Sequence, residues 1–146
     1  MKIKTSRFGI LEIDENKIIT LKKGILGFPD AKKFAIFPHS SKSPFYWMQS
    51  TEDETLAFVV IHPSVFCADY SFDIPDNVLE ELEIKTREQV ELFVIVTVHK
   101  PASEGENVRV SANLLGPVVI NTDNMTGMQI VLDPGRYPVQ FDIPLK

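Results

Sequence analysis

The sequence predicts a mainly β protein: a single compact, antiparallel, β-barrel-like domain over residues 1–146, with about nine or ten short strands and one or two short helices. Runs of β-branched and aromatic residues, such as LAFVVI and ELFVIVTVHK, recur along the chain. Short segments rich in Gly, Pro, Asn and Asp separate these runs. Only PDNVLEELEI has the spacing of an amphipathic helix. Strands joined by such short turns favour antiparallel pairing.

The N-terminal half predicts two hairpins and the strands between them. KIKTSRF and GILEI alternate polar and apolar residues, and with the turn DEN and the strand KIITL they predict an N-terminal hairpin or meander. KKGILGFPDAKK is expected to be an ordered loop that turns Ile25, Leu26 and Phe28 inward. KFAIFP predicts a strand, and PFYWMQS and LAFVVI predict a second hairpin joined by TEDET. LAFVVI is apolar throughout, so both of its faces are expected to be covered.

The middle of the chain is expected to hold one more strand, VFCADYSFDI, and then the helix. Asp73 or Asp76 is placed to cap this helix, and Pro75 suits its first turn. TREQ predicts a short turn, and ELFVIVTVHK predicts a central strand because it contains no breaker. The apolar face of the helix is expected to consist of Val78, Leu79 and Leu82.

In the C-terminal third, PASEGEN predicts a polar loop, and VRVSANLL and PVVIN predict two buried strands with a bend at Gly116–Pro117. Proline cannot donate to a strand ladder, and glycine tolerates unusual backbone angles. Asn113 and Asn121 are placed to hydrogen-bond the backbone at the strand ends. MQIVL and VQFDIPL predict the last two strands. Alternation in the second places four side chains on one face: Val139, Phe141, Ile143 and Leu145.

Composition indicates a globular protein of the cytosol. Hydrophobic residues make up 44% of the chain and charged residues 24%, which are ordinary values for such proteins. No apolar run approaches the length that spans a membrane, and the N-terminus lacks the apolar stretch of a signal peptide. The single cysteine, Cys67, cannot form an internal disulfide, in agreement with a reducing compartment.

Charge is distributed unevenly along the chain. Residues 1–50 carry nine Lys/Arg and four Asp/Glu, whereas residues 51–92 carry two Lys/Arg and eleven Asp/Glu. An acidic middle third argues against direct binding of nucleic acid, which requires clustered Lys and Arg. This region is either a solvated face that favours solubility or a surface that attracts a basic protein partner.

Motifs of catalysis and of cofactor binding are absent from the sequence. His39, His62 and His99 are too far apart in the chain to suggest a metal site, and Cys67 in an apolar run is more typical of core than of a nucleophile. No nucleophile elbow, phosphate loop or dinucleotide fingerprint occurs. We therefore expect neither enzymatic activity nor a cofactor. In PFYWMQS, alternation places Phe45 and Trp47 on one face of the strand.

Six motifs in order resemble the flagellar assembly factor family, FliW: KGILGF, PFYWMQS, LAFVV followed by HP, FVIVTV, NLLGPVVIN and G-x-Q-I-V-L. The resemblance runs from Lys23 to Leu132. The departures are mild: Gly116 stands where the family usually has Ala, His62 where Asn is common, and Met48 where Leu is frequent.

The resemblance implies a non-enzymatic protein with two protein partners bound in alternation. One is flagellin, the filament subunit, held in the cytoplasm before export. The other is the carbon storage regulator CsrA, an RNA-binding dimer that represses flagellin translation. Capture of CsrA is noncompetitive with RNA and relieves the repression. The resemblance also implies no membrane association, and we expect the free protein to be a monomer.

Three sets of candidate residues follow from these considerations, and a β-barrel that binds a small apolar ligand is the alternative function. Regulator binding is assigned to an acidic surface, because an RNA-binding partner must be basic. Flagellin binding is assigned to aromatic residues that line a groove for a helix. The third set holds the motif residues that are expected to be structural. The sets are, in turn: Glu52, Asp53, Glu54, Glu80, Glu81 and Glu83; Phe45, Trp47, Phe66 and Tyr70; and Asn113, Leu114, Gly116, Pro117, Asn121 and Gln129.

Overall fold

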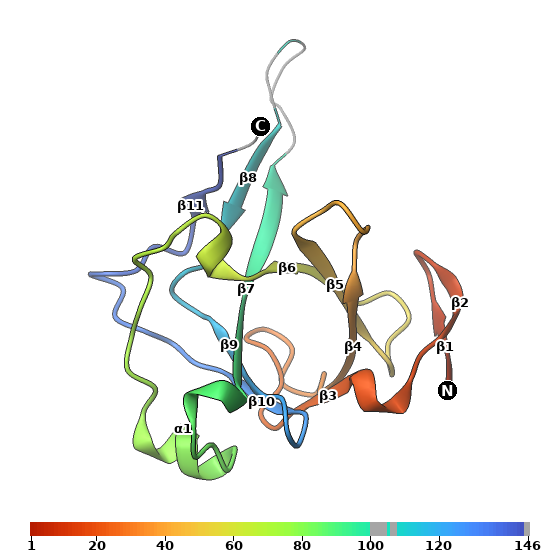
Figure 1. Ribbon diagram of the computed structural model, residues 1–146. Coiled ribbons are helices and arrows are strands. Elements are labelled where there is room, and N and C mark those ends of the chain that lie inside the picture. Colours follow the sequence, from red (N-terminus) through yellow and green to blue (C-terminus); the bar gives the residue numbers. More distant parts are fainter. Residues whose placement is uncertain (100–104, 106–107, 145–146) are drawn as a thin grey trace.

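Seven strands close into a barrel in the computed structural model, which describes residues 1–99, 105 and 108–144 (Figure 1). Around the ring the strands follow the order β9, β10, β3, β4, β5, β6 and β7, and β7 pairs back to β9. The predicted mainly β, barrel-like fold is confirmed. The barrel strands are β3 (Ile18–Leu21), β4 (Lys33–Pro38), β5 (Phe45–Ser50), β6 (Ala57–Ile61), β7 (Val90–His99), β9 (Val118–Asn121) and β10 (Thr126–Gln129).

Pairing around the ring is antiparallel except between β3 and β10, which are parallel. Strand direction cannot alternate completely around a closed ring with an odd number of strands. A seven-strand barrel must therefore contain a parallel pair, and it falls where the first barrel strand meets the last. The antiparallel pairing expected from the short turns holds for the other six contacts of the ring.

The remaining elements lie outside the barrel. A hairpin of β1 and β2, predicted from the alternation of its residues, stands beside β4 and β5, while β8 and β11 extend the far half of β7 (Figure 1). The short helix α1 lies below β9 and β10 in the same view. Their bounds are β1 (Lys2–Thr5), β2 (Gly9–Glu12), β8 (Arg109–Ala112), β11 (Phe141–Asp142), α1 (Asp76–Glu81), and the 3₁₀ turns η1 (Glu15–Lys17), η2 (Pro63–Val65) and η3 (Arg87–Gln89).

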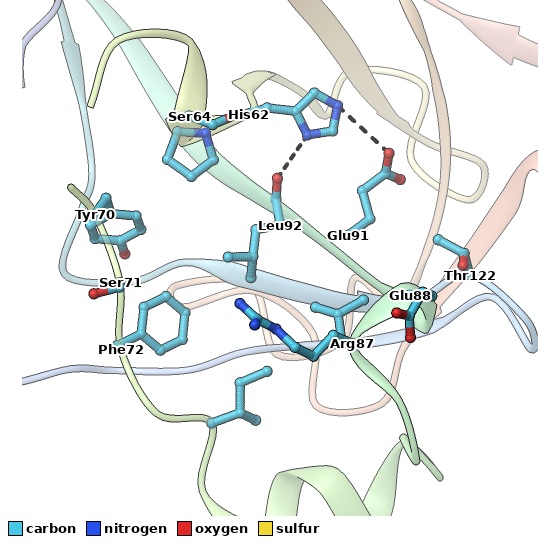
Figure 2. A pocket seen from close by; sticks show the side chains of 13 residues that line it. His62, Ser64, Tyr70, Ser71, Phe72, Arg87, Glu88, Glu91, Leu92 and Thr122 are labelled. Atoms are coloured by element: carbon cyan, nitrogen blue, oxygen red, sulfur yellow. Dashed lines mark hydrogen bonds and ion pairs between the residues drawn. The ribbon is translucent and has the colours of Figure 1, made fainter. Parts of the chain in front are cut away.

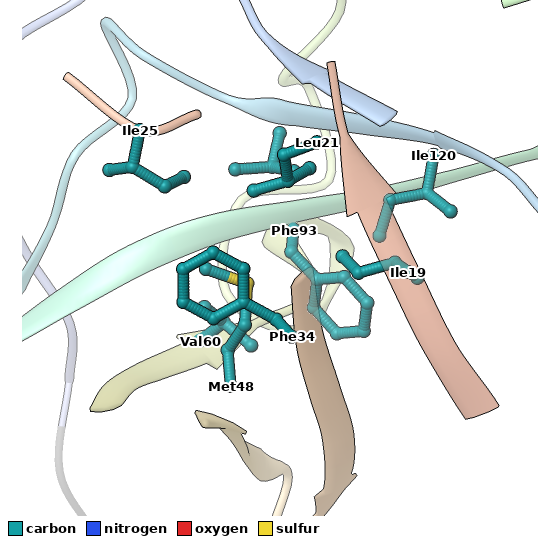
Figure 3. Close-up of a cluster of buried hydrophobic side chains, with 9 residues drawn as sticks. Ile19, Leu21, Ile25, Phe34, Met48, Val60, Phe93 and Ile120 are labelled. Atoms are coloured by element: carbon teal, nitrogen blue, oxygen red, sulfur yellow. The ribbon is translucent and has the colours of Figure 1, made fainter. Parts of the chain in front are cut away.

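Large apolar side chains fill the barrel interior (Figure 3). Met48 is fully buried there and Tyr46 packs against the same cluster, while Phe45 and Trp47 point to the outer face of β5, as alternation predicted. The side chains of this cluster occupy the interior of the barrel, the space in which other barrels of similar size hold a small ligand. The cluster consists of Ile19, Leu21, Ile25, Phe34, Met48, Val60, Phe93, Val118 and Ile120.

SANLLGPVVIN forms a large bulge against β7. Strands β8 and β9 lie end to end along one edge of β7, with Ala112 opposite Val96 and Val118 opposite Phe93. The five residues 113–117 therefore face only Val94 and Ile95 on β7. The predicted bend at Gly116–Pro117 is confirmed, and the extra residues leave the sheet between two buried strands.

The segment VFCADYSFDI forms no strand, contrary to the prediction. It begins in η2 and a following turn, in which the N–H of Cys67 donates to the carbonyl of Pro63. Its apolar residues instead cover two outer clusters, Phe66 and Tyr70 at one and Phe72 and Ile74 at the other. Its aromatic and apolar residues are therefore accounted for by packing across the barrel wall, although the segment does not pair in a sheet.

Three local predictions were also wrong. Pro75, and not an Asp, occupies the N-cap of α1, without a side-chain cap. Strand β11 spans two residues instead of seven, because proline at 138 and 144 removes ladder donors on both sides, and Val139 is exposed. In the loop over 23–31 Ile25 is buried, but Leu26 and Phe28 are exposed, because a tight turn from Ile25 to Phe28 directs them outward. Leu145 and most of PASEGEN lie outside the described residues.

No helix within residues 1–99, 105 and 108–144 is long and apolar enough to cross a membrane.

The loop over 23–31 yields a matched pair of substitutions. Gly24 and Gly27 both have positive φ, +69° and +88°, but only at Gly24 would an added Cβ meet backbone, 2.5 Å from the carbonyl oxygen of Pro29. We expect Gly27→Ala to lower the free energy of unfolding by about 1–2 kcal/mol, the cost of a left-handed conformation. Gly24→Ala should cost about 1–3 kcal/mol more, through overpacking. Urea unfolding measures both; equal losses would contradict the close approach at Gly24.

Candidate functional site

A groove runs along the outside of the barrel beside the first half of β7. It consists of three hollows that share lining residues: one of about 660 Å³ around Leu92, one of about 720 Å³ around Val90, and one of about 370 Å³ against α1. Phe72 and Ile74 line the first and second, and Leu79 and Ile84 line the second and third. We call this continuous surface the β7–α1 groove.

The end of α1 is shaped by its C-terminal cap. The N–H of Ile84 donates to the carbonyl of Leu79 (2.8 Å), and the N–H of Glu83 to that of Glu80 (3.1 Å). Glu83 adopts φ +56°, so these two hydrogen bonds form a Schellman motif. In this motif the residue after the left-handed one approaches the third-last helical residue. The cap therefore places Ile84 and Leu79 together in the groove.

Asn121, at the end of β9, fastens this cap to the barrel. Its buried amide donates to the carbonyls of Leu82 (2.8 Å) and Glu83 (3.3 Å), and its oxygen accepts the N–H of Asp123 (2.9 Å). The amide of Asn124 donates to the same Leu82 carbonyl at 3.1 Å. A six-residue helix is too short to be stable alone in water, so these bonds and the burial of Leu82 hold it in place.

The groove has an apolar floor built from three directions. Tyr70, Phe72 and Ile74 come from residues 65–74, the crossing segment, which runs over the barrel wall. Val90 and Leu92 come from β7, and Leu79 and Ile84 come from α1 and its cap. Figure 2 labels Tyr70, Phe72 and Leu92. These residues are half-buried, so they expose apolar surface. The Tyr70 hydroxyl donates to the carbonyl of Leu114 in the bulge at 2.7 Å, and burial raises the pKa of this phenol well above its usual range.

His62 occupies one end of the groove. Its ring stacks on Phe93, with centroids 4.3 Å apart, and its Nδ1 lies 3.0 Å from the carbonyl oxygen of Leu92. Because a carbonyl can only accept, Nδ1 carries the hydrogen, and Nε2 is left facing the carboxylate of Glu91 at 3.6 Å. The ring is therefore fixed by packing and one hydrogen bond. The carboxylate marks the start of an acidic rim (Figure 2).

The rim of the groove carries more carboxylates than cations. Of these carboxylates, only Glu91 lies within 4 Å of a basic side chain among the described residues, at 3.6 Å from Nε2 of His62. Arg87 reaches across the first hollow toward Phe72 (Figure 2). The rim carboxylates are Asp73, Asp76, Glu80, Glu83, Glu88 and Glu91, and the rim cations are Lys85 and Arg87.

The structure divides the predicted acidic surface in two. Glu80 and Glu83 line the groove, and Glu81 faces Lys22, with its carboxylate 3.9 Å from the ammonium. The other three residues form the β5–β6 turn beside the N-terminal hairpin, where the N–H of Ser6 donates to the carbonyl of Glu54. Hydrogen bonds from the hydroxyl and N–H of Thr55 lower the pKa of Asp53 in this turn. The turn residues are Glu52, Asp53 and Glu54.

The four predicted aromatic residues also fall in different places. Only Tyr70 lines the groove. Phe45, Phe66 and Tyr70 all pack against the outer cluster between β7, β8 and β11. Trp47 lies beneath the N-terminal hairpin, in edge contact with Phe8 and with Arg7 4.9 Å above its ring. Three of the four residues therefore share one outer cluster, and only Trp47 lies apart from them.

The family-motif residues brace the bulge. The oxygen of the Asn113 side chain accepts the N–H groups of Leu115 and Gly116, both at 3.0 Å. The amide of Gln129 donates to the carbonyl of Gly116 (2.9 Å), and its oxygen accepts the N–H of Leu26 (2.8 Å). These bonds link the bulge, β10 and the loop over 23–31. Leu114 is buried in the outer cluster, and Pro117 is buried at the start of β9.

Sequence reasoning missed the floor of the groove. The sequence places Phe72, Ile74, Ile84 and Leu92 in predicted strands or the predicted helix and Val90 in no element, and none of the five is among the candidate site residues. The sequence signal was there: apolar residues at 70, 72 and 74 alternate with the polar Ser71 and Asp73 on the approach to an acidic helix. Alternation of this kind also occurs in a segment that lays one face on a barrel without pairing.

The helix cap yields three comparable substitutions. We expect Asn121→Ala to lower the free energy of unfolding by about 1–3 kcal/mol, because it leaves the buried carbonyl of Leu82 without its shortest donor. Asn124→Ala should cost less, since that side chain is largely exposed.

Glu83→Gly should raise stability by about 0.5–1 kcal/mol by relieving the positive φ. Thermal and urea unfolding test these values, with Glu83→Gln as the control for loss of charge; stabilisation by Gln equal to that by Gly would contradict the conformational explanation.

Comparison with known proteins agrees with this architecture. The FliW protein family matches residues 2–143. The flagellar assembly factor FliW of Syntrophus aciditrophicus (strain SB) is 43% identical over 143 residues, which cover 98% of this chain and 87% of the relative. That of Bacillus licheniformis is 40% identical over 137 residues, or 94% and 92% of the two chains. A crystal structure of the flagellar assembly factor FliW superposes with a TM-score of 0.84 at 35% identity and covers 100% of this chain and 99% of its own. The chain therefore belongs to the FliW family of flagellar assembly factors.

Proposed function

We propose that this chain is a non-enzymatic, cytoplasmic regulator that binds flagellin and CsrA in alternation. It holds flagellin before export, and when flagellin is scarce it binds CsrA away from the RNA-binding surface. Repression of flagellin translation is thereby relieved. In this proposal the free protein is a monomer. The observation that carries the proposal is the match to flagellar assembly factors along nearly the whole chain.

The arrangement of cavities supports binding of a macromolecule over binding of a small ligand. The barrel interior, where a lipocalin-like protein would hold its ligand, is occupied by nine buried side chains. The open surface lies outside, in the β7–α1 groove, whose hollows join along α1 and β7. A long open groove with an apolar floor suits an extended or helical segment of another protein. This geometry disfavours the ligand-binding barrel.

Alternation has a simple energetic form. When two ligands exclude each other, each weakens the apparent affinity of the other by the factor 1 + [L]/Kd, where L is the competitor. Flagellin at about 100 times its own Kd therefore raises the apparent Kd for CsrA about 100-fold. Export lowers the concentration of free flagellin, and CsrA is captured again without any change in the regulator itself.

Calorimetric titration tests the proposal directly. Purified CsrA is titrated into this chain alone and in the presence of excess flagellin monomer, both partners taken from the bacterium that encodes the chain. We expect CsrA to bind the free chain and to lose apparent affinity in proportion to added monomer. Assembled filaments should not compete, because their terminal segments are already packed. The proposal fails if neither partner binds, or if both bind at once with unchanged Kd values.

A further inference from the structure

We propose that the β7–α1 groove is a receptor for a basic amphipathic segment, with its apolar side chains on the floor and its Lys or Arg side chains against the rim. Of the two proposed partners, the RNA-binding regulator is the one that must carry clustered cations. The inference therefore assigns the groove to the regulator, and for that assignment it rests on the proposed function.

The first support is the chemistry of the floor. Phe72, Ile74, Leu79, Ile84 and Val90 line the middle hollow of the groove, and they come from the crossing segment, α1, its cap and β7. Each is only half-buried, and four of them, all except Leu79, pack against one apolar cluster. Apolar surface that is contiguous and flanked by charge is typical of a site where another protein docks.

The second support is the charge of the rim. Its six carboxylates outnumber its two cations, Lys85 and Arg87, and none of the six forms a salt bridge with a Lys or Arg in the described part of the chain. An acidic segment brought to this rim would meet like charge. A basic one would gain favourable pairs and faster association. The apolar floor and acidic rim together thus select against acidic and purely polar partners.

The third support is that the site is rigidly built. The Schellman cap fixes the shape of the end of α1, and the side chains of Asn121 and Asn124 attach this end to the barrel through Leu82. The Tyr70 hydroxyl attaches the crossing segment to the bulge at Leu114. A segment that docks here therefore meets a surface already in its binding shape. Little ordering of the groove itself opposes binding.

Two charge-reversed variants separate this groove from the other acidic region. Glu80→Lys with Glu88→Lys reverses charge at opposite ends of the groove. Glu52→Lys with Glu54→Lys makes the same change of net charge in the β5–β6 turn, outside the groove. All four side chains are exposed, so both double variants should fold, which circular dichroism and thermal unfolding verify.

Fluorescence anisotropy measures binding of CsrA, of flagellin and of three synthetic peptides about 14 residues long. One peptide has Leu at helical spacing and Lys elsewhere, the second replaces Lys by Glu, and the third replaces Leu by Ser. We expect the groove variant to weaken binding of CsrA and of the Leu/Lys peptide by about tenfold or more and to reduce its salt dependence. The turn variant should change either by less than about threefold. The Leu/Glu and Ser/Lys peptides should bind the native chain weakly.

The possible outcomes distinguish the groove from the proposed function. Native protein that binds the Leu/Lys peptide in a groove-dependent way but does not bind CsrA would retain the receptor and refute the proposed partner. CsrA binding that is weakened as much by the turn variant as by the groove variant would overturn the assignment of the groove. Failure to bind the Leu/Lys peptide, or equal binding of the Leu/Glu peptide, would overturn the receptor itself.

Discussion

The pairing of β7 with two partners along one edge is the constraint on which the rest of the structure depends. Its first half pairs with β9 and closes the barrel, and its second half pairs with β8 and leaves the ring. Because residues 113–117 bulge out between β8 and β9, these two consecutive strands can both pair with β7. The bulge also anchors the groove: the carbonyl of Leu114 receives the hydroxyl of Tyr70, and the carbonyl of Gly116 receives the amide of Gln129. The motif NLLGPVVIN, one of those that resemble the family, thus supports the candidate site, and the site itself lies beside it.

The groove follows from a short helix fixed to a closed barrel. A barrel with a filled interior can offer binding surface only on its outer wall, at its ends or in the segments that cross it. Here the crossing segment and α1 lay apolar side chains beside β7 without covering it fully, while their polar side chains form the rim. The positive φ of Glu83 shapes the end of α1, and the hydrogen bond from Asn121 to Leu82 holds this end against the barrel.

The sequence was informative wherever local pattern and tertiary environment agree. β4, β5, β6 and β7 alternate or run apolar as strands do, and each was predicted close to its observed bounds. Prediction failed where burial came from another source: VFCADYSFDI is β-like in composition but packs across the wall without a ladder. It also failed for the acidic surface, because Glu54 and Glu80 belong to the same acidic stretch of the sequence yet are attached to different parts of the barrel. Charge along the chain identified an acidic region. Only the fold could show which part of that region adjoins an apolar floor.

Hydrogen–deuterium exchange of the chain with and without CsrA tests the central claim, that the β7–α1 groove is the surface that receives the regulator. Amides of the crossing segment, α1 and the first half of β7, residues 70–92, should exchange more slowly in the complex. Amides of the N-terminal hairpin and the β5–β6 turn should keep their free rates. Protection confined to the hairpin and that turn, with residues 70–92 unchanged, would contradict the account.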